Sequence, residues 1–153
     1  MTSSKPQKQV FLTYAHSDKT AVRKLYDRLT QNRIKVWLDE QELLPGQNWQ
    51  YEIRQAILRS DIVIVCLSRQ FNKQGGFRHE ELKIVLEKAG SIPEGEIFLI
   101  PVRLEKCRVL QPLSRWQYVD LFEADGYKRL LLTLRKNGVT NSPAAHSRLG
   151  LTK

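Results

Sequence analysis

The feature that most constrains the fold is a continuous apolar run, DIVIVCLS, at Asp61–Ser68. Its β-branched residues do not alternate with polar ones, which is typical of a strand that is covered on both faces. Such strands belong to parallel sheets, in which a helix usually connects one strand to the next. The run therefore predicts an α/β fold with helices on both faces of a parallel sheet.

Shorter strand-like runs alternate with helical patterns along the rest of the chain. Strands are expected at Gln9–Ala15, Ile34–Asp39, Ile97–Val102 and, as a short edge strand, Arg115–Leu121. Apolar residues at helical spacing mark residues 21–29, 49–59, 75–90 and 126–138. We therefore expect a flavodoxin-like, three-layer sandwich with a five-stranded parallel sheet, for which the strand order 2-1-3-4-5 is common.

The formal net charge of +9 lies mainly at the two ends of the chain. Residues 1–9 and 135–153 together hold six basic residues and no acidic one, which leaves 19 basic and 16 acidic residues between them. Basic ends are commonly solubilising or disordered, so we expect no nucleic-acid binding by the folded part. We expect one domain at residues 9–138, flanked by flexible segments at 1–8 and 139–153.

Several classes of protein are excluded by what the sequence lacks. No apolar run approaches the roughly 20 residues that span a membrane, and the N-terminus lacks the apolar middle of a secretory signal. Cys66 lies inside the apolar run and is expected to be a buried free thiol, which fits a reducing, cytoplasmic compartment. No Cys/His pair has metal-ligand spacing, and no glycine-rich phosphate loop or G-x-S-x-G motif is present. We expect no metal and no membrane partner.

The expected fold predicts where a ligand binds. In a doubly wound sheet, ligands lie beyond the carboxyl ends of the strands, where the strand order reverses between strands 1 and 3. Two expected loops flank that point, YAHSDK after strand 1, with Ser17 or Asp18 as a helix N-cap, and SRQFNKQGGF after strand 3. The second loop leads into a helix that begins with two adjacent acids, Glu80 and Glu81. A further loop, EQELLPGQN, is expected after strand 2.

The helical rotation of about 100° per residue separates these two acids. The stripe expected to pack on the sheet consists of Leu82, Val85, Leu86 and Ala89. Glu80 lies nearly opposite this stripe and is expected to point to water, whereas Glu81 lies beside it, four residues after Phe77. From geometry alone, Glu81 either lines the crevice at the end of the sheet or merely complements the helix dipole.

Six segments together resemble a known family. In order and spacing, the chain from about Gln9 to Asn137 resembles a Toll/interleukin-1 receptor (TIR) domain of the bacterial type, on the segments VFLTYAHSDK, VWLDEQELLPGQNW, SDIVIVCLS, GGFRHEEL, LIPVRLE and WQYVDL. The resemblance implies the flavodoxin-like fold and one of two functions: NAD+ cleavage at the nicotinamide–ribose bond, or scaffolding through contacts between TIR domains. It further implies a role in bacterial defence signalling, with a site that a neighbouring subunit can complete.

The resemblance also assigns roles to residues. Catalytic members carry a W-x-x-x-E pattern where the helix after strand 3 begins; here Phe77 stands in place of the tryptophan, and Glu81 is the glutamate. Trp49 lies in the segment that shapes the nucleotide pocket and either covers the substrate or belongs to the core of the second helix, while Trp37 is expected in the core. The implied catalytic residue is Glu81, and the implied substrate-binding residues are Tyr14, Ala15, His16, Asp39, Trp49, Ser68 and Phe77.

One carboxylate is chemically sufficient for NAD+ cleavage. A glycosidase needs a second acid to protonate its leaving group, but the nicotinamide of NAD+ is already cationic and leaves as a neutral base. The carboxylate has to hold the ribose and stabilise a developing oxocarbenium ion. Capture of the ribosyl cation by water gives ADP-ribose, and capture by a ring atom of the adenine gives a cyclic isomer. NAD+ is then a substrate, with no cofactor, and the alternative is a non-catalytic TIR scaffold.

Overall fold

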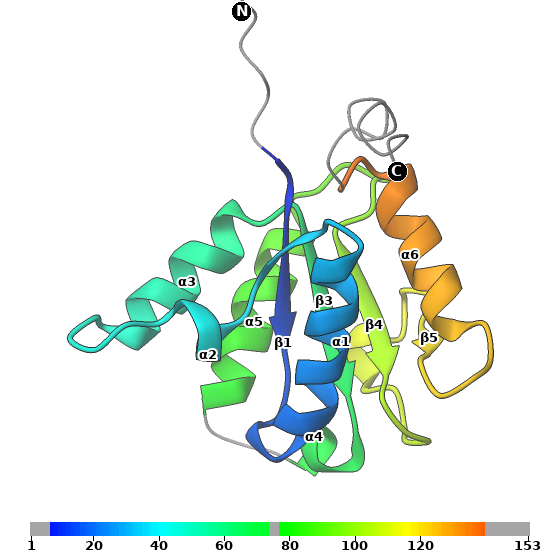
Figure 1. Cartoon of the computed structure of the whole chain (residues 1–153), viewed down its shortest axis with the longest axis horizontal. Coiled ribbons are helices and arrows are strands. Elements are labelled where there is room, and N and C mark those ends of the chain that lie inside the picture. Colours follow the sequence, from blue (N-terminus) through cyan, green and yellow to red (C-terminus); the bar gives the residue numbers. More distant parts are fainter. Residues whose placement is uncertain (1–6, 74–76, 140–153) are drawn as a thin grey trace, which may run out of the picture.

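The computed structural model describes residues 7–73 and 77–139, without the side chains of residues 77–79. The segments expected to be flexible, 1–8 and 139–153, lie mostly outside these residues. The sheet has five parallel strands in the order β2-β1-β3-β4-β5 (Figure 1). The strands are β1 (Gln9–Thr13), β2 (Lys35–Trp37), β3 (Ile62–Leu67), β4 (Leu99–Arg103) and β5 (Val119–Asp120). The expected flavodoxin-like α/β fold and strand order are confirmed.

Helices cover both faces of the sheet (Figure 1). The longer helices are α1 (Lys19–Gln31), α3 (Trp49–Arg59), α5 (Phe77–Ala89) and α6 (Gly126–Lys136). Apolar residues of α1 and α6 form one core with one face of the sheet, and those of α3 and α5 form a second core with the other face. Of the helices in the described part of the chain, none is long and apolar enough to cross a membrane.

The two cores share the central strands, because successive residues of a strand point to opposite faces of the sheet. Val10 of β1 belongs to the first core, and Phe11 belongs to the second. All six residues of β3 are buried, as the unbroken apolar run predicts. Cys66 of β3 is a fully buried free thiol, and burial raises the pKa of that thiol. Trp37 is buried in the core, as expected, and stacks on Phe11 with ring centroids 5.2 Å apart.

Two short helices replace parts of the expected loops. α2 (Asp39–Glu42) begins almost directly after β2, so this strand is shorter than the sequence pattern predicted. α4 (Arg69–Lys73) follows β3 at once. Its start is capped by Ser68, whose Oγ accepts a hydrogen bond from the backbone nitrogen of Phe71 at 2.9 Å. The buried side chain of Phe71 then anchors this helix in the second core.

The edge strand β5 has two residues, whereas the sequence pattern predicted a strand over residues 115–121. A 3-10 turn, η2 (Gln111–Leu113), and the bends after it occupy the preceding residues. Arg103 of β4 fixes β5, because its Nε donates to Oδ1 of Asp120 at 2.6 Å and its Nη2 donates to Oδ2 at 2.8 Å. Gly126 allows α6 to begin against β5, since a Cβ at this position would collide with the backbone carbonyl of Asp120.

Candidate active site

The buried acid Glu81 lies at the carboxyl end of β1, next to the point where the strand order reverses. Only 3% of Glu81 is exposed, and its Oε1 accepts a hydrogen bond from Oγ1 of Thr13 at 2.9 Å. Thr13 is the last residue of β1 and is fully buried. Glu80, one residue earlier on α5, is exposed, as the helical rotation predicts. The two adjacent acids therefore lie in opposite environments, and only Glu81 faces the sheet.

A second hydroxyl–carboxylate hydrogen bond joins the ends of the same two strands, β1 and β3, in the opposite sense. Ser68 follows β3 directly, and its buried Oγ donates to Oδ2 of Asp18 in the 3-10 turn η1 (His16–Asp18) after β1. The segment after β3 thus supplies the acid for the end of β1, and the segment after β1 supplies the acid for the end of β3. These two pairs, Thr13–Glu81 and Ser68–Asp18, are the crossed pairs of the site.

The other residues with predicted roles after β1 differ in their surroundings. Tyr14 is buried, and its hydroxyl donates to Oδ1 of Asp39 at 2.6 Å. The same oxygen of Asp39 accepts from the backbone nitrogen of Glu40 at 2.8 Å, at the start of α2. Ala15 is buried, whereas His16 is exposed. The structure therefore brings Tyr14 and Asp39 together and ties the end of β1 to the start of α2.

The two aromatic residues with predicted roles lie at the starts of helices. Trp49 begins α3 and is 43% exposed, so the alternative that placed it in the core of this helix is wrong. The buried residues of α3 are Ile53, Ala56 and Ile57. Phe77 begins α5, but its side chain lies outside the described residues. The role of Phe77 beside Glu81 stays a prediction.

Sequence reasoning did not assign Thr13 and Asp18 to the site. The available signal for Thr13 was a polar side chain on the face of β1 that carries Phe11 into the second core. A buried hydroxyl at such a position requires a hydrogen-bond partner. Asp18 does occupy the N-cap position of α1, as one of the two alternatives predicted, but its side chain makes no capping hydrogen bond. Its carboxylate accepts the Ser68 hydroxyl instead.

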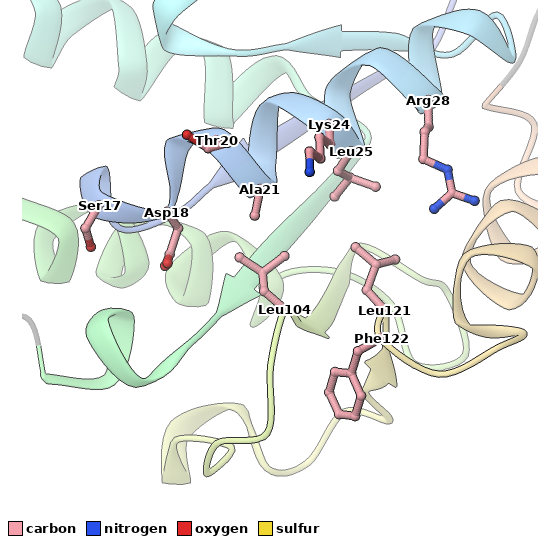
Figure 2. Close-up of a pocket in the computed structure, with 10 residues that line it drawn as sticks. All are labelled: Ser17, Asp18, Thr20, Ala21, Lys24, Leu25, Arg28, Leu104, Leu121 and Phe122. Carbon is pink, nitrogen blue, oxygen red and sulfur yellow. The ribbon is translucent and has the colours of Figure 1, made fainter.

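A groove lies between the start and one face of α1 and the segments that follow β4 and β5 (Figure 2), and Ser17 and Asp18 of η1 line one end of it. Its volume is about 490 Å3. Figure 2 shows its basic side chains, Lys24 and Arg28, on α1, and three apolar side chains, Leu104, Leu121 and Phe122, on the opposite wall. Asp18 lines this groove and also belongs to the crossed pairs, whereas Thr13 and Glu81 do not line it. The groove and the Glu81 carboxylate are therefore separate features, and η1 connects them because Asp18 belongs both to the groove lining and to the crossed pairs.

The chemistry available at the crossed pairs is that of one buried carboxylate, Glu81, and one half-buried carboxylate, Asp18. Such a group can accept hydrogen bonds from the hydroxyls of a sugar and can stabilise a positive charge. Among the residues that the structure describes, no cluster of three or more His, Cys, Asp or Glu side chains is arranged to hold a metal ion. A nearby exposed ion pair joins Arg69 of α4 to Glu105 at 3.0 Å, and the hydrogen bond from Arg69 lowers the pKa of Glu105.

A parallel sheet of order 2-1-3-4-5, with buried polar side chains where that order reverses, defines a flavodoxin-like α/β protein with a candidate site at its switch point. Within that class, a family model described as a TIR domain matches residues 10–131 of this chain. The chain therefore belongs to the TIR domain family, as the sequence resemblance implied.

Similar proteins occur among bacteria, archaea and animals. The uncharacterized protein y4cD of Sinorhizobium fredii is 27% identical over 120 residues, which cover 77% of this chain and 19% of that protein. The NAD(+) hydrolase TcpA of Theionarchaea archaeon is 32% identical over 94 residues, which cover 61% of this chain and 27% of that protein. The chain thus matches less than a third of the length of either relative.

A solved structure gives the same fold. The TIR domain of the Toll-related receptor TRR-2 from Hydra magnipapillata superposes with a TM-score of 0.68 and 24% sequence identity. The match covers 82% of this chain and 97% of that chain. At this identity the likeness concerns the fold, which agrees with the family assignment.

Proposed function

We propose that this TIR domain cleaves the nicotinamide–ribose bond of NAD+, with Glu81 as the catalytic carboxylate. The products are nicotinamide and either ADP-ribose or a cyclic isomer. The observation that carries the proposal is the buried carboxylate of Glu81 at the carboxyl end of β1, hydrogen-bonded to Thr13 at 2.9 Å. The relative named as an NAD(+) hydrolase, 32% identical over 94 residues, supports this reaction class.

Burial makes a single carboxylate effective in this reaction. As the bond to nicotinamide breaks, the departing base takes the bonding electrons and becomes neutral, while positive charge develops on the ribose ring. A carboxylate stabilises that charge more strongly where water is excluded, because the local dielectric constant is low. Since only 3% of Glu81 is exposed, the proposal requires that NAD+ binding or contact between copies of the chain uncovers the carboxylate.

The test measures nicotinamide release from NAD+ over a series of protein concentrations. Glu81→Gln removes the charge but keeps the shape of the side chain and an oxygen that can accept the Thr13 hydroxyl. We expect this variant to lower kcat by at least about 100-fold, as for other groups that stabilise charge in a transition state. The matched control is Glu80→Gln, because Glu80 lies on the same turn of α5 and is exposed; its kcat should stay near that of the wild type.

Two results would contradict this proposal. Activity that survives in Glu81→Gln but disappears in Glu80→Gln would assign the reaction to the other acid. Absence of nicotinamide release at every concentration, from protein shown to be folded by circular dichroism, would refute the hydrolase function altogether. The concentration series matters because a neighbouring subunit can be needed to complete the site.

A second candidate function is scaffolding through contacts between TIR domains. It is favoured by large apolar side chains that remain exposed between α2 and the first turn of α3: Leu44 is 63% exposed and Tyr51 is 56% exposed, beside Trp49. Exposed apolar residues that gather in one region mark protein–protein contact sites. Sedimentation at the same concentrations as the turnover assay separates the candidates, because a defined oligomer without turnover favours the scaffold.

The remaining expectations stay predictions. They include the cytoplasmic location, the role in bacterial defence signalling, the absence of nucleic-acid and membrane partners, and the domain boundaries at residues 9 and 138. The substrate contacts proposed earlier for the residues around the site also stay predictions. For Ser68, the hydroxyl proton is already donated to Asp18, so a substrate contact through that proton would require this hydrogen bond to break.

A further inference from the structure

We propose that Thr13 is a positioning residue of the active site, whose hydroxyl holds the Glu81 carboxylate in one orientation. The inference rests on the proposed cleavage of NAD+ by Glu81, and it adds a residue that acts through Glu81 without touching the substrate. Its basis is the hydrogen bond from Oγ1 of Thr13 to Oε1 of Glu81 at 2.9 Å, between two buried side chains.

Thr13 is suited to this role because the sheet holds it in place. It ends β1, which lies between β2 and β3, and its backbone pairs with Val65 of β3. A β-branched side chain has few accessible χ1 rotamers, and complete burial leaves Thr13 little space to change rotamer. The longer side chain of Glu81 has more rotatable bonds to fix. The hydroxyl of Thr13 is therefore held in one position, and its hydrogen bond restricts the more flexible side chain of Glu81.

The hydrogen bond is compatible with chemistry at the same carboxylate. A carboxylate offers about four acceptor sites on two oxygens, so the bond to Thr13 does not by itself prevent ribose hydroxyls from binding to Glu81. Orientation matters for rate, since a displacement of about 1 Å in a reacting group can cost roughly 100-fold. Removal of the Thr13 hydroxyl should thus lower turnover more than substrate binding.

The other crossed pair does not suggest the same role for Ser68. Its hydroxyl donates to Asp18 and accepts from the backbone of Phe71, which fixes the start of α4 against η1. Neither of these partners takes part in the proposed reaction. The hydrogen bond to the proposed catalytic carboxylate distinguishes Thr13 from Ser68.

The test compares kcat and KM for NAD+ in the full chain with Thr13→Val and Thr13→Ser. Thr13→Val replaces the hydroxyl with a methyl group of similar size, and it should lower kcat by about 10- to 100-fold while KM changes by less than about threefold. Thr13→Ser keeps the hydroxyl donor but not the β-branch, so it should lower kcat clearly less than Thr13→Val does. Combined with Glu81→Gln, Thr13→Val should leave the residual turnover unchanged, because Thr13 acts through Glu81.

The matched control is Ser60→Ala, which removes a buried hydroxyl at the opposite end of the sheet. Oγ of Ser60 donates to the backbone oxygen of Ala56 at 2.6 Å and accepts from Nε2 of Gln9 at 2.8 Å. Loss of these hydrogen bonds should lower Tm. It should not lower kcat, because neither partner lies near Glu81.

The outcomes separate this inference from the proposed function. Wild-type kcat in Thr13→Val, or equal losses in Thr13→Val and Thr13→Ser, would overturn the positioning role alone, provided that Glu81→Gln is inactive. A kcat loss in Ser60→Ala as large as that in Thr13→Val would also overturn it, since the loss of kcat would then result from lower stability and not from the orientation of Glu81. If the wild type releases no nicotinamide at any protein concentration, the proposed function fails and the inference fails with it.

Discussion

Replacement of Asp120 by asparagine should destabilise the protein, because Asp120 neutralises a half-buried guanidinium. Its two oxygens accept from Nε and Nη2 of Arg103 at 2.6 and 2.8 Å, and both side chains are 18% exposed. Arg103 also donates to the backbone oxygen of Cys107 at 2.6 Å and lies 4.7 Å from the ring centre of Tyr118. These contacts keep the guanidinium in place in Asp120→Asn, where it would lack its counter-charge.

The size of the effect follows from this geometry. A hydrogen bond to a charged group contributes about 1.5–3 kcal/mol net, whereas an exposed ion pair contributes about 0–1 kcal/mol. Because each side chain of this pair remains 18% exposed, we expect Asp120→Asn to lower the free energy of unfolding by about 2 kcal/mol at pH 7. For a domain of this size, that loss corresponds to a Tm decrease of roughly 4–8 °C.

The pH dependence of the same difference is a second readout. The hydrogen bonds from Arg103 hold the pKa of Asp120 below its ordinary value. A carboxyl group with a lowered pKa in the folded state contributes stability above its unfolded pKa, about 3.9, and this contribution is lost as the pH falls through the folded pKa. The difference in unfolding free energy between the wild type and Asp120→Asn should therefore be constant from pH 7 to about pH 5 and should shrink below about pH 4.

Urea unfolding followed by circular dichroism measures both quantities. Glu105→Gln is the control, because Glu105 forms a similar two-point ion pair with Arg69 in a more exposed place. It should destabilise the protein less than Asp120→Asn does, since solvent screens exposed charges. Equal stability of Asp120→Asn and the wild type at pH 7, or a difference that persists unchanged at pH 3, would refute the reasoning.

Thiol labelling should distinguish the two cysteines, since the half-buried Cys107 should react with DTNB in the folded protein and Cys66 only upon unfolding. Complete burial blocks access to Cys66 and raises the pKa of its thiol, so equal labelling rates would contradict the described packing of β3. Gly126→Ala should lower the free energy of unfolding by about 1–3 kcal/mol, because the added Cβ would collide with the backbone carbonyl of Asp120. An unchanged urea midpoint in this variant would show that α6 can shift away from β5 without cost.

The sequence was sufficient to separate the two acids of α5, because that inference depends on local geometry alone. Once the apolar stripe is identified, the rotation of about 100° per residue places Glu80 in water and Glu81 toward the sheet. The hydrogen-bond partner of Glu81 could not be found in this way. Thr13 lies 68 residues earlier in the chain, and the contact depends on how the chain crosses from β3 to α5. The periodicity of neither segment contains that information.

The helix α2 and the bounds of the edge strand β5 were the other parts of the fold that sequence patterns did not predict. α2 has four residues and β5 has two, so neither is long enough for a hydrophobic period to appear. Trp49 illustrates a related limit, since it precedes the buried Ile53 by one helical turn, which is compatible with a place in the core. However, the first turn of α3 extends away from the sheet (Figure 1), and Trp49, the first residue of this helix, is 43% exposed.

Both edges of the sheet are short, and this limits how copies of the chain can associate. β2 provides three residues and β5 provides two, so each edge presents few unpaired backbone groups. Longer edges are templates for strand addition from another molecule and for aggregation. Recognition between copies would have to be encoded in side chains instead. Partner choice could then diverge through single surface substitutions, while the sheet and its buried acid remain unaltered.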